Sequence, residues 1–332
     1  MELKTIPSIL AKTNSLQVAY PQAIEFANKQ LSIFWLPEEI KVEKDIQDIL
    51  VNMTPAEKHG VITTLKLFTL YELKAGSEYW GGRFKDTFTR TELQRMASVF
   101  CAFELAIHKP FYSKINELLH LDTDDFYHSY EHDPILKDRM AFIGDMMDAE
   151  DELWSIAAFS MIEGAVLYSA FAFLKHFQSQ GKNKLLNVVR GINFSLKDEA
   201  LHSDAGAWVF RTLKLESNLS EEKAAELEKK VIECAYKLYE HECHVVDLTF
   251  GGGNIEGITS IQMKRFVESR INHCLSQLGY KPIFTVTYNP IGAWFYDSIN
   301  GFTLNDTFSG VGNSYHRNWT ETDFVWEDYN QK

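Results

Sequence analysis

The feature that most constrains the fold of this 332-residue chain is a carboxylate inside an apolar helix. Residues 157–174 read Ala-Ala-Phe-Ser-Met-Ile-Glu-Gly-Ala-Val-Leu-Tyr-Ser-Ala-Phe-Ala-Phe-Leu, and Glu163 is the one charged residue among them. A helix that is apolar on every face belongs at the centre of a protein. A buried carboxylate costs several kcal/mol unless it is ion-paired or binds a metal. The sequence therefore predicts a central helix in which Glu163 has a partner.

Two further glutamates stand in similar surroundings. Glu72 ends the segment Leu-Lys-Leu-Phe-Thr-Leu-Tyr-Glu, and Glu104 follows Val-Phe-Cys-Ala-Phe. One such residue could equally well pair with a buried lysine or arginine. Three of them on three separate helices are better explained by a shared site.

Histidines accompany two of the acidic positions. Glu199 and His202 lie one helical turn apart on the same face, and Glu104 and His108 are spaced by four. Each pair alone is weak support, but a di-metal site in a helical bundle takes two single glutamates and two acid–histidine pairs from four helices. The predicted ligands, in that pattern, are Glu72, Glu104, His108, Glu163, Glu199 and His202. Such a set holds two cations and leaves positions open for oxygen.

Apolar periodicity and helix-start signals predict one all-α domain over residues 1–280. The expected helices are 15–31, 54–80, 89–119, 134–150, 151–179, 182–214, 219–250 and 259–278. Thr54 before Pro55 and Ser220 before two glutamates are typical of helix starts. After Gly279 the helical period is lost, so residues 281–332 are expected to form an extension and a flexible or docking tail.

Composition excludes several classes of function. The net charge of −13 argues against binding nucleic acid or an anionic membrane surface. No stretch of about 20 residues lacks charge, so no membrane span is expected. The N-terminal segment does not resemble a signal peptide, and the four cysteines are too widely spaced for a metal or redox pair. A cytoplasmic protein with reduced thiols is expected. His241 and His244 are more typical of a solvated face than of a metal pair.

At these residues the sequence resembles the small subunit of class I ribonucleotide reductase over nearly its whole length. Lys197–His202 is similar to the metal-binding Asp-Glu-x-x-His segment of that family, and Phe34–Glu39 to its Phe-Trp-x-Pro-Glu element. The stretch 102–112 resembles the helix that carries a ligand histidine and, four residues later, the radical tyrosine. Phe308–Tyr315 and Leu278–Pro282 resemble the class Ib subgroup.

The resemblance implies a ferritin-like four-helix bundle with additional flanking helices, a homodimer, and a separate large subunit bound through the C-terminal tail. Two metal ions per chain, iron or manganese, would react with oxygen or a reduced oxygen species and oxidise Tyr112 to a stored radical. By analogy, His108, Asp198 and Trp35 would relay the oxidising equivalent, and Tyr315 would continue the relay to the large subunit, which reduces ribonucleotides. The resemblance leaves open whether a flavodoxin-like activator is needed.

A stored radical needs a dry, apolar pocket, and Phe111, Leu167 and Phe171 are candidate walls for Tyr112. Without the resemblance, Tyr112 would be interpreted as an ordinary core phenol.

Two departures from the family pattern concern the ligands. The first ligand is usually aspartate, whereas this chain has Glu72. The family also spaces its third-helix pair as Glu-x-x-His, but here Leu105 stands three residues before His108 and Glu104 stands four before it. We hypothesise that a π-helical turn brings Glu104 into line, since such turns concentrate at functional sites. If Glu104 pointed outward, a metal-free radical variant would be favoured.

Two rival functions fit the same ligands. One is a ferritin-like di-metal oxidase that acts on its own substrate, which would not need Trp35, Asp198 and a tail tyrosine as a relay. The other is a metal-storage protein, which would not need the aromatic-rich C-terminus.

Overall fold

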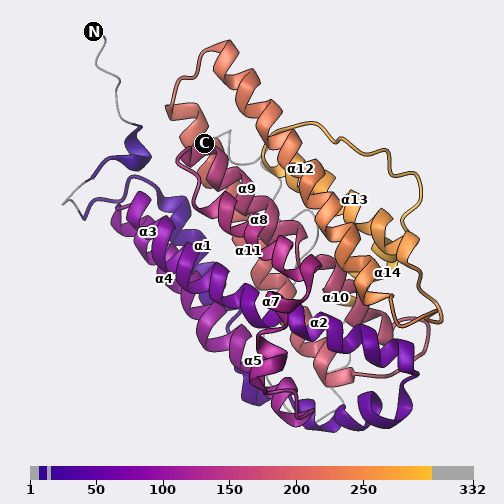
Figure 1. Ribbon diagram of the computed structural model, residues 1–332. Helices are drawn as coiled ribbons and strands as arrows, with labels where there is room; N and C mark the ends of the chain where they lie inside the picture. Colours follow the sequence, from indigo (N-terminus) through magenta and orange to yellow (C-terminus); the bar gives the residue numbers. More distant parts are fainter. Residues whose placement is uncertain (1–6, 13–15, 301–332) are drawn as a thin grey trace.

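The computed structural model describes residues 7–12 and 16–300, and it shows helices packed side by side (Figure 1). These residues contain no β-strand; an isolated bridge between Ile255 and Ile258 is the one β-type pairing among them. The predicted all-α class is therefore confirmed.

The bounds of the helices follow the predicted segments closely. The longer α-helices are α1 (Pro21–Ser32), α2 (Pro55–Leu73), α4 (Thr91–Phe103), α5 (Lys109–Leu118), α8 (Pro134–Met147), α9 (Glu152–Ala165), α10 (Tyr168–Lys175), α11 (Leu186–Glu216), α12 (Glu221–Thr249), α13 (Ser260–Gln277) and α14 (Pro290–Asn300). Short α-helices are α3 (Phe84–Thr87), α6 (Asp124–Tyr127) and α7 (Ser129–His132). The 3₁₀ turns are η1 (Ser8–Leu10), η2 (Pro37–Glu39), η3 (Val42–Lys44) and η7 (His176–Gln178), and the π-helical segments are η4 (Asp48–Asn52), η5 (Lys74–Arg83) and η6 (Glu104–His108).

Helix α9 is the centre of the bundle, as its sequence predicted. All of its residues from Ser155 to Ala165 are buried, and α8, α11, α12 and α13 pack against it (Figure 1). The segment Glu152–Gln178 is long and apolar enough to cross a membrane, but its most apolar window is entirely buried inside the protein. Protein side chains therefore surround this window.

The predicted helix starts at Thr54 and Ser220 are present. The Glu57 amide donates to Oγ1 of Thr54 at 3.2 Å, and the Thr54 amide donates back to Glu57 at 2.8 Å, so the two side chains satisfy two backbone amides at this helix start. Oγ of Ser220 accepts from the amide of Lys223 in the same way.

The predicted helix 151–179 is interrupted between α9 and α10. Two buried arginines bind backbone carbonyls at this break: Arg270 donates to Gly164 from Nε at 3.1 Å and Nη2 at 2.9 Å, and Arg139 donates to Val166 at 2.8 Å. Arg139 also pairs with the buried Glu242 at 2.9 Å. The interruption is stabilised by side chains distant in sequence, which a local pattern does not reveal.

Helix α14 was not expected from the sequence. Oδ1 of Asn289 accepts from the amide of Gly292 at 3.0 Å and caps the helix start, and the side chain of Phe295 is fully buried. Because α14 packs against α10 and α13, the expected extension contains a helix that lies on the bundle.

Candidate metal centre

All six predicted ligands meet in the interior of the bundle. Glu72 lies near the end of α2, Glu104 and His108 are the first and last residues of η6, Glu163 lies in α9, and Glu199 and His202 lie in α11. Each of the six side chains is at most 1 % exposed.

The six residues form two overlapping groups of four. Glu72, Glu104, His108 and Glu199 make the first group, whose candidate ligand atoms all lie within 4.8 Å of one another. Nδ1 of His108 is 3.1 Å from Glu104, 3.4 Å from Glu199 and 3.5 Å from Glu72.

The second group, equally compact, consists of Glu104, Glu163, Glu199 and His202. Nδ1 of His202 is 2.8 Å from Glu104, 3.3 Å from Glu163 and 3.8 Å from Glu199. Glu104 and Glu199 belong to both groups, so each histidine faces one terminal glutamate and the two shared ones. Two shared carboxylates between two histidines are the arrangement that bridges a pair of cations.

A π-helical turn aligns Glu104 with the cluster. The turn, η6, runs from Glu104 to His108, and both of its end residues point into the site. The hypothesised π-helical turn is therefore present, and Leu105, at the spacing usual for the family, lies outside both ligand groups.

The donor atoms fit a metal better than an internal hydrogen-bond network. Within the described part of the chain, neither carboxylate oxygen of Glu72, Glu163 or Glu199 has a hydrogen-bond partner, nor has either ring nitrogen of His202. Buried polar groups are rarely left unpaired, and unpaired carboxylates least of all. A pair of cations would satisfy the carboxylate oxygens and Nδ1 of His202, so the residues fit a di-metal site.

Burial and mutual repulsion shift the protonation of the cluster. Burial, and then the charge of Glu104, raises the pKa of Glu72 well above its usual range. The pKa of Glu199 is also raised well above its usual range, by burial and then by the charges of Glu104 and Glu163. Burial opposes protonation of His202, but the nearby carboxylates of Glu104 and Glu163 raise its pKa to about 9. Because metals bind the deprotonated groups, cations have to displace protons from this site.

Asp198 joins the cluster to Trp35, as the resemblance implied. Its Oδ2 is 2.9 Å from Nε2 of His108 and accepts from Nε1 of Trp35 at 2.9 Å. Because a carboxylate only accepts hydrogen bonds, the Nε2–H of His108 donates to Asp198, and Nδ1 is the ring nitrogen that could bind a cation. The rings of Trp35 and His108 stack with centroids 6.0 Å apart.

Gln30, on α1, is a partner of Asp198 that sequence reasoning missed. Its buried Nε2 donates to Oδ1 of Asp198 at 2.7 Å. Nothing in the local sequence distinguishes Gln30 from a surface glutamine, since the contact depends on the packing of α1 near α11.

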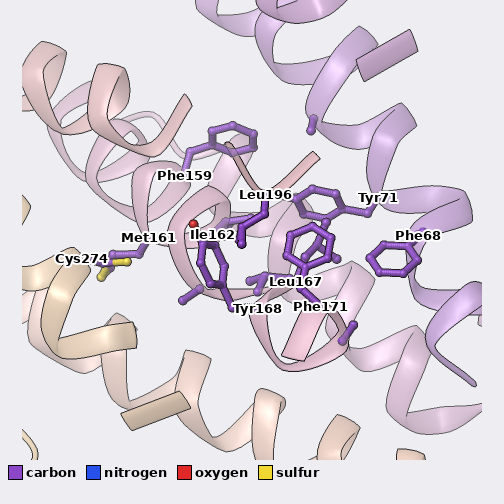
Figure 2. Close-up of a cluster of buried hydrophobic side chains, with 14 of the residues drawn as sticks. Phe68, Tyr71, Phe159, Met161, Ile162, Leu167, Tyr168, Phe171, Leu196 and Cys274 are labelled. Carbon is purple, nitrogen blue, oxygen red and sulfur yellow. The ribbon is translucent and has the colours of Figure 1, made fainter. Parts of the chain in front are cut away.

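Tyr112 lies in an apolar pocket beside the first ligand group. Its ring stacks on Phe68 with centroids 4.2 Å apart and contacts Phe111 at 5.0 Å. Phe171 also stacks on Phe68, with centroids 5.5 Å apart, and Leu167 belongs to the same apolar cluster (Figure 2). Phe68 is the wall that sequence reasoning missed, although it stands one helical turn before Glu72.

The hydroxyl of Tyr112 has no hydrogen-bond partner among the described residues. Burial, and then the charge of Glu72, raises the pKa of Tyr112 well above its usual range. The Tyr112 hydroxyl is therefore buried, close to Glu72 and held in its protonated form.

The remaining sequence candidates lie elsewhere. His244 is exposed, and His241 stacks on Phe142, remote from the cluster residues. The four cysteines are free thiols. Tyr315 lies outside the described residues.

Comparison with known proteins gives a consistent family match. The family model described as "Ribonucleotide reductase, small chain" matches residues 12–290. The probable ribonucleoside-diphosphate reductase small subunit of Invertebrate iridescent virus 3 is 26% identical over 92% of this chain and 85% of its own length. The ribonucleoside-diphosphate reductase 2 subunit beta of Escherichia coli is 25% identical over 95% of both chains.

Solved structures agree on the fold. The dimanganese(II)-NrdF of Streptococcus sanguinis matches with a TM-score of 0.73 at 21% identity, over 85% of this chain and 97% of that one. The ribonucleotide reductase R2 subunit of Clostridium botulinum matches with a TM-score of 0.72 at 24% identity, over 84% and 88%. The predicted ferritin-like bundle is thereby confirmed.

Proposed function

Because the chain belongs to the ribonucleotide reductase small-chain family, we propose that its buried cluster binds two metal ions and that Tyr112 stores the radical they generate. As a small subunit of this oxidoreductase, the protein works with a large subunit, and the family is generally homodimeric.

The observation that carries the proposal is the pair of ligand groups that share Glu104 and Glu199. Two histidines on opposite sides of two shared carboxylates match the requirement for a bridged metal pair. Once bound, the metal pair supplies the oxidising power, through reaction with oxygen or a reduced oxygen species, that removes an electron from Tyr112.

The residues around the cluster then have distinct tasks. Phe68 and Phe111 exclude water from Tyr112, so that its radical is not quenched. Asp198 fixes the orientation of His108 and also accepts a hydrogen bond from Trp35. This continuous path from ligand to indole supports a relay, which a di-metal oxidase acting on its own substrate would not need.

Several finer features belong to the same proposal. We assign the metals to iron or manganese, and the resemblance of Leu278–Pro282 and Phe308–Tyr315 to class Ib members supports assignment to that subgroup. The C-terminal tail docks on the large subunit and brings Tyr315 into the relay. A flavodoxin-like activator would be a further partner. A cytoplasmic location is consistent with the four free thiols.

Removing residues 310–332 tests the role of the tail. The truncated protein is expected to lose ribonucleotide reduction in the presence of the large subunit, because both the docking segment and Tyr315 are missing. Metal content and the tyrosyl EPR signal are expected to stay at the level of the full chain, because all six cluster residues lie before residue 203.

A full-length Tyr315→Phe variant is the matched control for docking. It should still bind the large subunit, measured by calorimetry, while activity is lost. Retained activity in the truncated protein would remove the tail and Tyr315 from the relay.

A further inference from the structure

Two π-helical segments face each other beside the cluster. η5 (Lys74–Arg83) follows α2 and begins two residues after Glu72, and η6 begins at Glu104; the two segments pack against each other. π-Helical turns are rare, so a facing pair on two ligand-bearing helices requires a packing reason.

Gly76 of η5 lies at the point of closest approach. A Cβ atom placed on Gly76 would lie 2.8 Å from Cβ of Glu104 and 2.9 Å from Cγ of Leu105. Real Cβ atoms essentially never approach other heavy atoms within 3.0 Å, so no residue with a side chain fits here without displacement of a neighbour.

The neighbour that would have to move is a shared ligand. The Cβ of Glu104 is the first atom of its side chain, and it moves only with the backbone of η6. Its two oxygens reach Nδ1 of His202 at 2.8 Å and Nδ1 of His108 at 3.1 Å, so a displacement affects both ligand groups. Metal sites tolerate errors of only about 0.2 Å in ligand distance.

Leu105 explains why the glycine matters in this chain. Leu105 stands at the spacing where the family usually carries the glutamate, yet it lies outside the ligand groups and its Cγ abuts the position of a Cβ on Gly76. Relative to the family pattern, the glutamate is shifted by one residue, and the Cβ of Glu104 and the side chain of Leu105 both lie next to Gly76. Because Gly76 has no side chain, there is room for both of them.

On the basis of the proposed di-metal function, we propose that Gly76 is a positioning residue that sets the register of η6 and thereby the placement of Glu104 between the two metals. Gly76 acts through the backbone of Glu104 and does not itself contact a metal.

The test is binding of Mn²⁺ to the full-length Gly76→Ala variant, followed by calorimetry and by EPR of the unbound ion. We expect affinity to fall about 10- to 100-fold, comparable to the loss of a residue that orients a ligand. Gly144→Ala is the matched control: Gly144 is also helical, on α8, but a Cβ there meets no atom within 4 Å. It should bind Mn²⁺ as the wild type does.

A double variant, Gly76→Ala with Leu105→Ala, separates positioning from simple overpacking. It relieves the contact with Leu105 but keeps the contact with Cβ of Glu104. We expect thermal stability of the metal-free protein to recover while Mn²⁺ affinity stays low. Recovery of affinity in the double variant, or unchanged affinity in Gly76→Ala, would overturn the role of Gly76. A wild type that binds no Mn²⁺, Fe²⁺ or other divalent ion would overturn the proposed function as well.

Discussion

The Glu104→Ala variant is expected to lose tight binding of both metals. Its affinity should fall by more than the roughly 10- to 100-fold that is typical when a residue hydrogen-bonded to a metal ligand is removed. Glu104 is one of two carboxylates that belong to both ligand groups, and its oxygens lie 2.8 and 3.1 Å from the two histidines. Removing it leaves each group with three ligands instead of four. Metal content per chain, measured after dialysis, is the direct readout.

The thermal transition gives a second readout. A ligand at 100 times its dissociation constant stabilises the folded state by about 2.7 kcal/mol, and Glu104→Ala should lose this metal-dependent gain. Leu105→Ala is the matched control, since it alters the adjacent residue of the same π turn without removing a carboxylate. If Glu104→Ala bound two metals as tightly as Leu105→Ala, Glu104 would not be a ligand.

The Tyr112→Phe variant is expected to abolish both the tyrosyl EPR signal and ribonucleotide reduction while leaving metal content unchanged. Phenylalanine keeps the stacking on Phe68 but has no hydroxyl to oxidise. Because the Tyr112 hydroxyl has no hydrogen-bond partner among the described residues, its removal should leave stability equal or slightly higher.

Tyr71→Phe is the control that matches this variant most closely. Tyr71 is also buried, its hydroxyl also lacks a partner in the described part of the chain, and its pKa is also raised well above the usual range, by burial and then by Glu163. The Tyr71→Phe protein should keep its radical and its activity. A signal that survives in Tyr112→Phe but disappears in Tyr71→Phe would move the radical to Tyr71.

The sequence predicted the helices well because their apolar periods and caps are local. Thr54 and Ser220 mark helix starts that the structure contains. The break between α9 and α10 was missed because the arginines that stabilise it, Arg139 and Arg270, come from other helices. Helix α14 was missed because Pro290 and Gly292 obscure its period, although an Asn-Pro pair is itself compatible with a helix start.

The residues of the candidate site that could be predicted are the charged ones that stand in apolar, buried segments. A charged residue in an otherwise apolar helix, such as Glu163, can be recognised from the sequence alone. Gln30 and Phe68 do not, because a glutamine or a phenylalanine at those positions is unremarkable until the packing is known. Gly76 is of the same kind, since its importance depends on how closely η5 approaches η6.

The central claim is tested most directly by metal content per chain together with the EPR spectrum, on full-length protein from a host supplied with both iron and manganese. We predict about two metals per chain and a tyrosyl signal that disappears in the Tyr112→Phe variant. A persistent organic radical on metal-free protein would contradict the di-metal assignment, and metal without any radical after exposure to oxygen and to superoxide would contradict the role of Tyr112.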